Sequence, residues 1–332
     1  MRKNLTFKFI DLFAGIGGFH LACASLGGTA VFASEWDKDA AEVYERNFGL
    51  KPAGDITKIP EKEVPGHDVL CAGFPCQAFS ISGKQRGFED SRGTLFFDVA
   101  RIAREKRPKV MFLENVKNLE RHDGGRTLDV ITRTLDEIGY DVRFKVLDAS
   151  RFGVPQSRKR IYFVCFRKDL DAKGFAFPEG KEPERHVEDI LLPDSETEKY
   201  IVERSDIFID GGTVKERRTD KPLRIGFVNK GGQGERIYSP LGTAITLSAY
   251  GGGAGAMTGL YLVNGKVRKL APRECARLDG FPESFKLAER DRTAWRQFGN
   301  SVVVPVLERI MERALSLDSV AAALRSSLSE SA

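Results

Sequence analysis

The segment around Cys76 has the residue types of a nucleophilic site. Cys76 follows Phe74-Pro75 and precedes the polar run Gln77-Ala78-Phe79-Ser80. A cysteine placed after a proline and before small, polar residues is typical of a displayed thiol, which can attack an electrophile as its thiolate. A lone cysteine at the end of an apolar strand is also commonly a small buried side chain. The chemistry therefore depends on what accompanies the thiol.

Other motifs accompany Cys76 in a fixed order along the chain. Before it lies a glycine turn, and after it come a carboxylic acid motif, a pair of arginines and a C-terminal Phe-Gly-Asn-Ser motif: Phe13-Ala14-Gly15-Ile16-Gly17-Gly18, Glu114-Asn115-Val116, Gln156-x-Arg158-x-Arg160 and Phe298-Gly299-Asn300-Ser301. A carboxyl group and a guanidinium can hold and polarise a substrate beside a nucleophile. Taken singly, the acid can be a helix cap and the arginines can be surface charge.

The glycine turn indicates a nucleotide-type cofactor. It joins an expected strand to an expected helix, which is where such cofactors are cradled. The turn does not match GxGxxG, so an ordinary strand-to-helix turn is the alternative. About twenty residues later Glu35 ends the next apolar run, where an acid would bind ribose hydroxyls, and Trp36 follows with an indole suited to adenine or a sulfonium. Asp55-Ile56 is placed to read the adenine amine.

Alternating strand-like and helix-like segments must position these residues. Strands are expected at 7–13, 30–34, 69–72, 110–113 and 161–166, with helical patterns between them. This alternation predicts an α/β fold with a mostly parallel, doubly wound sheet that binds ligands at the carboxyl ends of its strands. Cys76 and Glu114 both follow such strand ends.

A second, smaller and β-rich domain is expected after the α/β part. We divide the chain into a catalytic and cofactor-binding domain, a recognition domain, a hinge and a C-terminal helix that returns to the first domain: 1–189, 190–271, 272–299 and 300–332. Two glycine-rich loops, 230–236 and 248–253, flank a β-like segment at 244–247. Such loops are commonly plain turns, but glycine also lets the backbone approach a ligand closely. Residues 318–332 are expected to fray.

Composition narrows the class of protein. The 332 residues include 52 basic and 47 acidic side chains, a net charge of +5 that permits a polyanionic partner. Three basic clusters in the second half of the chain favour phosphate contact over a plain solvated face. Five cysteines without a CxxC pair and four histidines without ligand spacing argue against disulfides and metals. No apolar run reaches about 18 residues and no signal peptide is evident, so we expect a cytoplasmic bacterial protein without membrane contact.

The ordered motifs resemble those of DNA cytosine-5 methyltransferases. The resemblance covers nearly the whole chain apart from its termini and residues 178–222, and it is strongest to bacterial type II restriction-modification members that modify GCGC. It implies a Rossmann-like methyltransferase domain with a target-recognition domain, acting on double-stranded DNA. The implied cofactor is S-adenosyl-L-methionine, which leaves as S-adenosyl-L-homocysteine. The implied target is the inner cytosine of GCGC.

The resemblance also implies roles for individual residues. Cys76 would add to C6 of a cytosine flipped out of the duplex, while Glu114 would bond N3 and the exocyclic amine. Arg160 would hold O2, and Arg158 would support the site or a phosphate. The cofactor would be bound by Phe13, Gly15, Gly17, Gly18, Glu35, Trp36, Asp55, Ile56, Pro75, Leu95, Asn300 and Ser301. DNA would be bound by Ser80, Ser82, Gln233, Arg236, Tyr250 and Gly253.

Three other functions are weighed against this one. A DNA-binding regulator that has lost catalysis would be expected to lack Cys76 or Glu114, and both are present. An NAD-dependent oxidoreductase would need a third spaced glycine in the turn and would leave both residues unused. An RNA cytosine-5 methyltransferase shares the chemistry, but the two glycine loops favour duplex DNA. A monomer is expected, with a cognate restriction endonuclease as a possible partner.

Overall fold

The computed structural model describes residues 5–75, 95–211 and 217–329. These residues form two compact units, each built from more than one chain segment. Unit 1 comprises Met1–Leu147, Lys159–Pro178 and Leu307–Ala332, and unit 2 comprises Asp148–Arg158 and Glu179–Val306. Within the described ranges, no helix combines the length and the apolar content needed to cross a membrane.

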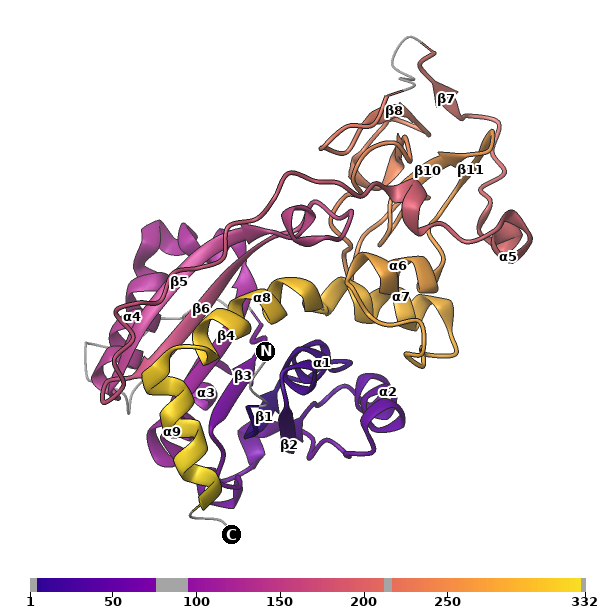
Figure 1. Cartoon of the computed structure of the whole chain (residues 1–332). Helices are drawn as coiled ribbons and strands as arrows, with labels where there is room; N and C mark the ends of the chain where they lie inside the picture. The colour runs from indigo at the N-terminus through magenta and orange to yellow at the C-terminus, as the bar shows by residue number, and fades with distance from the viewer. Residues whose placement is uncertain (1–4, 76–94, 212–216, 330–332) are drawn as a thin grey trace. The chain divides into compact units, whose positions relative to one another are not determined.

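Unit 1 is built on a six-stranded sheet in the order β2-β1-β3-β4-β6-β5 (Figure 1). Strand β1 pairs in parallel with β2 and β3, and β3 pairs in parallel with β4, whereas β6 is antiparallel to β4. The bounds are Phe7–Leu12 for β1, Gly28–Ser34 for β2, Val69–Ala72 for β3, Val110–Val116 for β4, Tyr140–Asp148 for β5 and Lys159–Arg167 for β6. The predicted mostly parallel α/β fold is confirmed.

The short apolar runs became strands because the sheet is covered on both faces. All four residues of β3 are buried, and so are the first six of β4, which is typical of central strands in a parallel sheet. Their side chains join those of α3 (Leu95–Lys106) and α4 (Arg126–Glu137) in one core. The other α-helices of this unit are α1 Gly18–Ser25, α2 Lys38–Phe48, α8 Val304–Leu315, which begins in unit 2, and α9 Asp318–Ser329.

Two elements differ from the sequence-based expectation. The strand β5 is missing from it, because β5 lies at the sheet edge with a largely half-buried or exposed pattern, and so lacks an apolar run. The expected fraying is wrong for Asp318–Ser329, which forms α9. Val320 and Leu324 are fully buried there, and the Lys109 ammonium donates to the Ser327 hydroxyl. Tertiary burial thus orders a segment whose composition is Ser/Ala-rich.

Unit 2 contains a five-stranded sheet in the order β11-β10-β9-β8-β7. The strands are Phe208–Ile209 for β7, Arg224–Phe227 for β8, Arg236–Tyr238 for β9, Leu260–Val263 for β10 and Lys266–Arg268 for β11, and β9 and β10 pair in parallel. Its helices are α5 Asp194–Thr197, α6 Pro272–Leu278 and α7 Asp291–Asn300. The sheet confirms the smaller β-rich part of the predicted fold.

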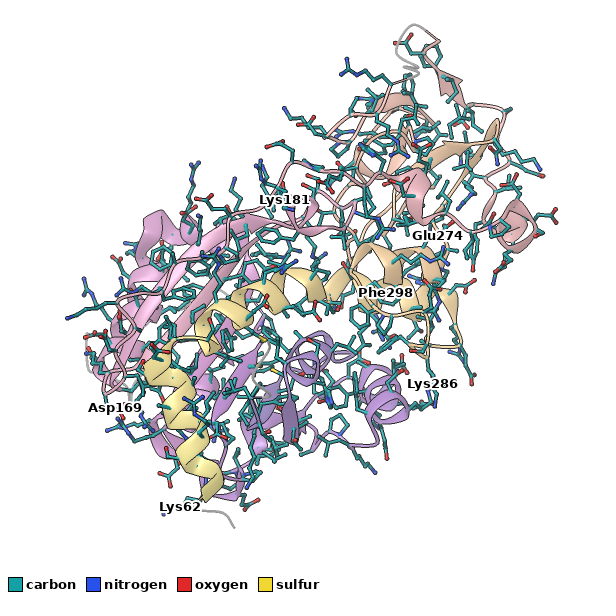
Figure 2. The ribbon with its side chains drawn as sticks, viewed as in Figure 1. Lys62, Asp169, Lys181, Glu274, Lys286 and Phe298 are labelled. Atoms are coloured by element: carbon teal, nitrogen blue, oxygen red, sulfur yellow. The ribbon has the colours of Figure 1, made fainter. Side chains whose placement is uncertain are left out.

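A buried ion pair organises the end of this sheet. The Arg268 guanidinium, on β11, donates to both carboxylate oxygens of Glu274, on α6, at 2.7 and 2.8 Å. Glu274 is labelled in Figure 2. Its carboxylate also accepts backbone N–H groups from Leu192 and Ala271 at 2.8 and 2.7 Å. Removing one partner of a buried, bidentate ion pair destabilises a fold strongly, because it leaves the other charge buried without compensation.

Replacing Glu274 with alanine should therefore lower the free energy of unfolding by about 3–5 kcal/mol, because it strands a buried guanidinium. The matched control is Glu182→Ala, which removes a carboxylate paired with Arg151 in the same unit but 74% exposed. That control should cost less than about 1 kcal/mol. Urea unfolding of the two variants measures the difference, and equal losses would contradict a dominant role for the buried pair.

Candidate functional site

The glycine turn lies where β1 and β2 end, and Glu35 ties the two ends together. Its carboxylate accepts the Gly15 N–H and the Asp37 N–H, both at 2.8 Å. Gly15 and Gly17 have φ angles of 54° and 89°, so the turn needs residues that tolerate left-handed backbone. Beside these, Trp36 leaves its indole 78% exposed. A polar turn, a buried acid and an open aromatic face therefore meet at one place.

The two glycines face different surroundings. A Cβ at Gly17 would lie 2.1 Å from the Phe48 ring, so α1 begins in direct contact with α2 side chains. A Cβ at Gly15 would meet no atom within 4 Å, so that face of the turn is open. The residues fit a nucleotide-type cofactor, since the Gly15 N–H bonds the Glu35 carboxylate and the exposed Trp36 follows Glu35 in the chain.

The electrostatics of this turn favour a positively charged ligand group. Burial raises the pKa of Glu35, although the backbone N–H bonds of Asp37 and Gly15 oppose the shift. Burial and the nearby Glu35 charge together raise the pKa of Asp11 well above its ordinary value, against a backbone hydrogen bond from His20. The Glu35 charge disfavours ionisation of Asp11, and a cation placed beside these acids would favour their charged forms. A sulfonium would meet this requirement.

Other predicted cofactor residues of unit 1 differ in their burial and in their contacts. Asp55 caps the 3-10 turn Ile56–Lys58 and its carboxylate accepts from the Thr57 N–H and hydroxyl at 3.1 and 2.8 Å, which lowers its pKa. The Ile56 side chain is buried, while Pro75 is exposed and Leu95 begins α3. Local hydrogen bonds thus already hold one of Asp55's carboxylate oxygens.

Glu114 and Arg160 form the polar centre at the end of the sheet. In the β4–β6 ladder Glu114 lies opposite Tyr162, two positions from Arg160, so the two side chains share one face. The Arg160 Nε lies 3.1 Å from Glu114 Oε1, and both side chains are largely buried. An arginine at this distance from a carboxyl group fixes the direction of that group. The structure thus brings together two of the four predicted catalytic residues.

Asn115 is a site residue that the motif analysis did not single out. Its Nδ2 donates to the Phe74 carbonyl at 2.8 Å, and its Oδ1 accepts the Val116 N–H at 2.8 Å. Asn115 is buried, and the Phe74 ring packs against Phe96. These contacts hold the backbone one residue before Pro75 and two before Cys76. The position of Asn115 directly after Glu114 was the available signal.

Cys76, Ser80 and Ser82 lie outside the described residues. The four cysteines within them are buried: Cys23, Cys71, Cys165 and Cys275. Burial raises the pKa of Cys71, Cys165 and Cys275, so these thiols are poor nucleophiles. No group of three or more His, Cys, Asp or Glu side chains in the described ranges is placed to hold a metal ion.

Arg158 supports the backbone of unit 2. It is 2% exposed, and its guanidinium donates to the Leu247 and Gly299 carbonyls at 2.9 and 3.0 Å and to the Ser301 carbonyl at 2.5 Å. Asn300 is the last residue of α7, and Ser301 follows it. These bonds fit the expected supporting role and connect the segment before the second glycine loop to the Asn-Ser motif.

The segment at 244–247 is extended, but it is not a strand of the sheet. Ala244 forms an isolated parallel bridge with Gln156. The Gln156 side chain accepts the Leu247 N–H at 3.1 Å and donates to Asp279 Oδ1 at 2.7 Å. A second chain segment, rather than a neighbouring strand, satisfies this backbone.

The two glycine loops of unit 2 touch through their backbones. The Gly255 N–H donates to the Gly234 carbonyl at 2.7 Å, and a Cβ on Gly234 would lie 1.8 Å from the Gly252 carbonyl oxygen. Four of the predicted DNA-binding residues lie on these loops or directly beside them: Gln233, Arg236, Tyr250 and Gly253. Gln233 is exposed and Tyr250 is 75% exposed. The contact makes one polar, solvent-facing surface from two loops.

Comparison with known proteins decides the family. The model of the C-5 cytosine-specific DNA methylases matches residues 7–316. The chain belongs to this family. It is 60% identical over 309 residues to the type II methyltransferase M.HhaI of Haemophilus parahaemolyticus, covering 93% of this chain and 94% of that relative. It is 44% identical to M.HpaII of Haemophilus parainfluenzae, covering 91% and 87%.

The solved structure of Dnmt2 from S. pombe has the same fold, with a TM-score of 0.71 at 22% identity over 93% of this chain and 98% of that one. The methyltransferase is thus a DNA cytosine-5 methyltransferase that uses S-adenosyl-L-methionine. This confirms the predicted reaction and cofactor, and the oxidoreductase alternative is wrong. The open face at Gly15, the acid Glu35 and the exposed Trp36 fit that cofactor.

Exchanging each of the two glycines for alanine should separate folding from cofactor binding. Gly17→Ala adds a clash to a positive φ, so we expect a loss of stability of about 2–4 kcal/mol. Gly15→Ala adds only backbone strain of about 1–2 kcal/mol and fills the open face, so it should mainly weaken cofactor binding. Thermal unfolding with and without S-adenosyl-L-homocysteine measures both effects. A variant order opposite to this one would contradict the assignment.

Proposed function

We propose that this methyltransferase modifies the inner cytosine of GCGC in double-stranded DNA, as the modification half of a restriction-modification system. The main structural observation in support of the catalytic site is the Glu114–Arg160 pair on one face of β4 and β6. The observation that supports the target is the resemblance of residues 231–237 and 246–253 to the pattern of GCGC-specific members. Backbone contact between these loops supports a single reading surface.

The chemistry begins with the low reactivity of C5 of cytosine. In our proposal the Cys76 thiolate adds to C6, which forms an S–C6 bond and moves the ring electron pair toward C5 and N3. Glu114, protonated or sharing a proton, hydrogen-bonds N3 and the exocyclic amine and so stabilises the charge that develops, and Arg160 holds O2. The cofactor supplies an electrophilic methyl group to the activated C5. Loss of the C5 proton to a base then lets the thiolate leave by elimination.

The role of Glu114 follows from its partner. The Arg160 Nε lies 3.1 Å from Glu114 Oε1 and orients that oxygen. The Glu114 backbone is fixed as well, because it belongs to the buried part of β4. Asn115 fixes the carbonyl of Phe74, so the chain enters Pro75-Cys76 from a defined point. Adjacent residues of one strand thus supply the proposed acid and hold the backbone that leads to the proposed nucleophile, and a fixed geometry of this kind favours reaction.

Such an addition requires a base outside the duplex stack. We assign Gln233 and Ser82 to the space that the base leaves, and residues 80–93 to a loop that closes over DNA. Arg236 would read a guanine in the major groove, with Tyr250 and Gly253 in the second loop. Cofactor contacts are assigned to the residues predicted above, including Pro75, Leu95, Asn300 and Ser301. Residues 190–271 would form the recognition domain, next to a hinge at 272–299.

The expected partners follow from the same proposal. A monomer is sufficient, since one chain supplies nucleophile, acid, cofactor turn and recognition loops. A restriction endonuclease of the same site would be its counterpart in the cell. An enzyme of bacterial DNA acts where that DNA lies, so we place it in the cytoplasm.

Bisulfite sequencing of plasmid from cells that express the chain tests reaction and target together. We expect protection of the inner cytosine at nearly every GCGC and no protection elsewhere. A plasmid that carries 5-methylcytosine in a different sequence would retain the reaction and refute the proposed target. Expression of Arg236→Ala alongside should reduce discrimination, because one bidentate base contact contributes about 1–3 kcal/mol.

Covalent trapping on DNA with 5-fluorocytosine tests the nucleophile. The wild type should form a stable adduct in the presence of S-adenosyl-L-methionine, and Cys76→Ser should form none and lose activity by more than about 10³-fold. The control is Cys165→Ala, which removes a buried thiol and should leave trapping unchanged. An adduct that persists in Cys76→Ser would remove this residue from the mechanism.

A further inference from the structure

A chain of polar contacts leads from an exposed arginine to the first glycine loop of unit 2. The Arg204 guanidinium donates to both oxygens of Asp206 at 2.7 Å. The Asp206 carboxylate accepts the Asn229 N–H at 3.0 Å, and the Asn229 Nδ2 donates to Glu235 Oε1 at 2.6 Å. Each link involves an ionised acceptor, which makes it stronger than a neutral hydrogen bond.

Glu235 connects these polar contacts to the backbone of the first glycine loop. Its second oxygen, Oε2, accepts the Gly232 N–H at 2.8 Å, while its backbone N–H donates to the Gly232 carbonyl at 3.0 Å. These two hydrogen bonds between Gly232 and Glu235 close the turn that contains Gln233 and Gly234. The hydrogen bond from Asn229 is the first cause of the lowered pKa of Glu235, so the carboxylate stays an acceptor for both donors.

The first glycine loop also contacts the second one through its backbone. Gly234 accepts the Gly255 N–H at 2.7 Å, and a Cβ on Gly253 would lie 2.7 Å from the Gly234 carbonyl oxygen. Backbone contacts this close transmit a shift of one loop to the other. Whatever sets the shape of residues 231–235 therefore sets the surface formed by both loops.

Asn229 is suited to this place for a backbone reason as well as a side-chain one. Its φ is 48°, in the left-handed region that asparagine tolerates better than most residues other than glycine. Its side chain is then free to reach across the turn to Glu235. Glycine would satisfy the backbone but supply no donor, so the two contributions can be separated by substitution.

We propose that Asn229 is a positioning residue for target recognition: its side-chain amide, acting through Glu235, sets the conformation of the loop that presents Gln233 and Arg236 to DNA. This inference rests on the proposed function, since it takes the two loops as the DNA-reading surface. Asp206 and Arg204 support Asn229 in turn, because the Asp206 carboxylate accepts the Asn229 N–H and is itself held by the Arg204 guanidinium.

The deciding variant is Asn229→Gly, which keeps the left-handed backbone and removes only the amide. We expect the ratio of kcat/KM for GCGC over sites with one changed outer base to fall about tenfold, the loss of one hydrogen bond to a charged group. The fluorescence of 2-aminopurine at the target position, in the ternary complex with S-adenosyl-L-homocysteine, should fall as well. KM for S-adenosyl-L-methionine and the midpoint of thermal unfolding should match the wild type.

A swap of donor and acceptor provides the rescue. Asn229→Asp places a second carboxylate against Glu235 and should impair discrimination at least as much as Asn229→Gly. The double variant Asn229→Asp/Glu235→Gln restores one donor and one acceptor across the same gap, and it should recover most of the lost discrimination. A purely structural role would predict instead that stability and activity on all sites change together.

The outcomes separate this inference from the proposal on which it rests. Gln233→Ala is measured in parallel for 2-aminopurine fluorescence. If Gln233→Ala lowers the signal while Asn229→Gly leaves both the signal and the discrimination ratio at wild-type values, the role of Asn229 is refuted and the function stands. If Gln233→Ala also behaves as wild type, the assignment of the loop to DNA fails, and the inference fails with it.

Discussion

The hydrogen bond from Asn115 to the Phe74 carbonyl joins the ends of the two central strands β3 and β4. Parallel strands end at the same edge of a sheet, but nothing in the ladder itself fixes the chain once it has left the last pair. Here the buried Asn115 side chain holds the chain by donating to the Phe74 carbonyl. The residue before Asn115 is Glu114, so one strand end both carries the acid and holds the backbone two residues before Cys76.

The cofactor turn is governed by a related constraint. Glu35 accepts two backbone N–H groups, one from the glycine turn and one from the start of α2. Burial works against its charge and that of Asp11. Both carboxyl groups thus lie where ionisation is disfavoured, and a cation placed beside them would favour their charged forms. Stability and ligand affinity are coupled through the same carboxylates.

In unit 2 the constraint is closeness of backbone rather than charge. Gly234 and Gly253 lie where any Cβ would meet a carbonyl oxygen at 2.7 Å or less. Removing side chains from the contact lets two loops present their neighbours on one surface. Arg158 holds other parts of unit 2 together, because its buried guanidinium donates to backbone carbonyls of segments far apart in the chain. Both devices hold loops that have little regular structure of their own.

The amino-acid sequence by itself determined where five of the six strands of the α/β part lie along the chain, the glycine positions and the reactive residue types. These are local properties, since apolar runs and left-handed turns follow from neighbouring residues. It did not reveal the edge strand β5, which pairs with β6 although most of its residues are half-buried or exposed, or the helix α9, whose Val320 and Leu324 are buried. The tertiary structure alone decided which partner each buried polar group finds. Asn115 bonds the Phe74 carbonyl and Arg160 pairs with Glu114 across residues far apart in the chain, and no local pattern encodes these partners.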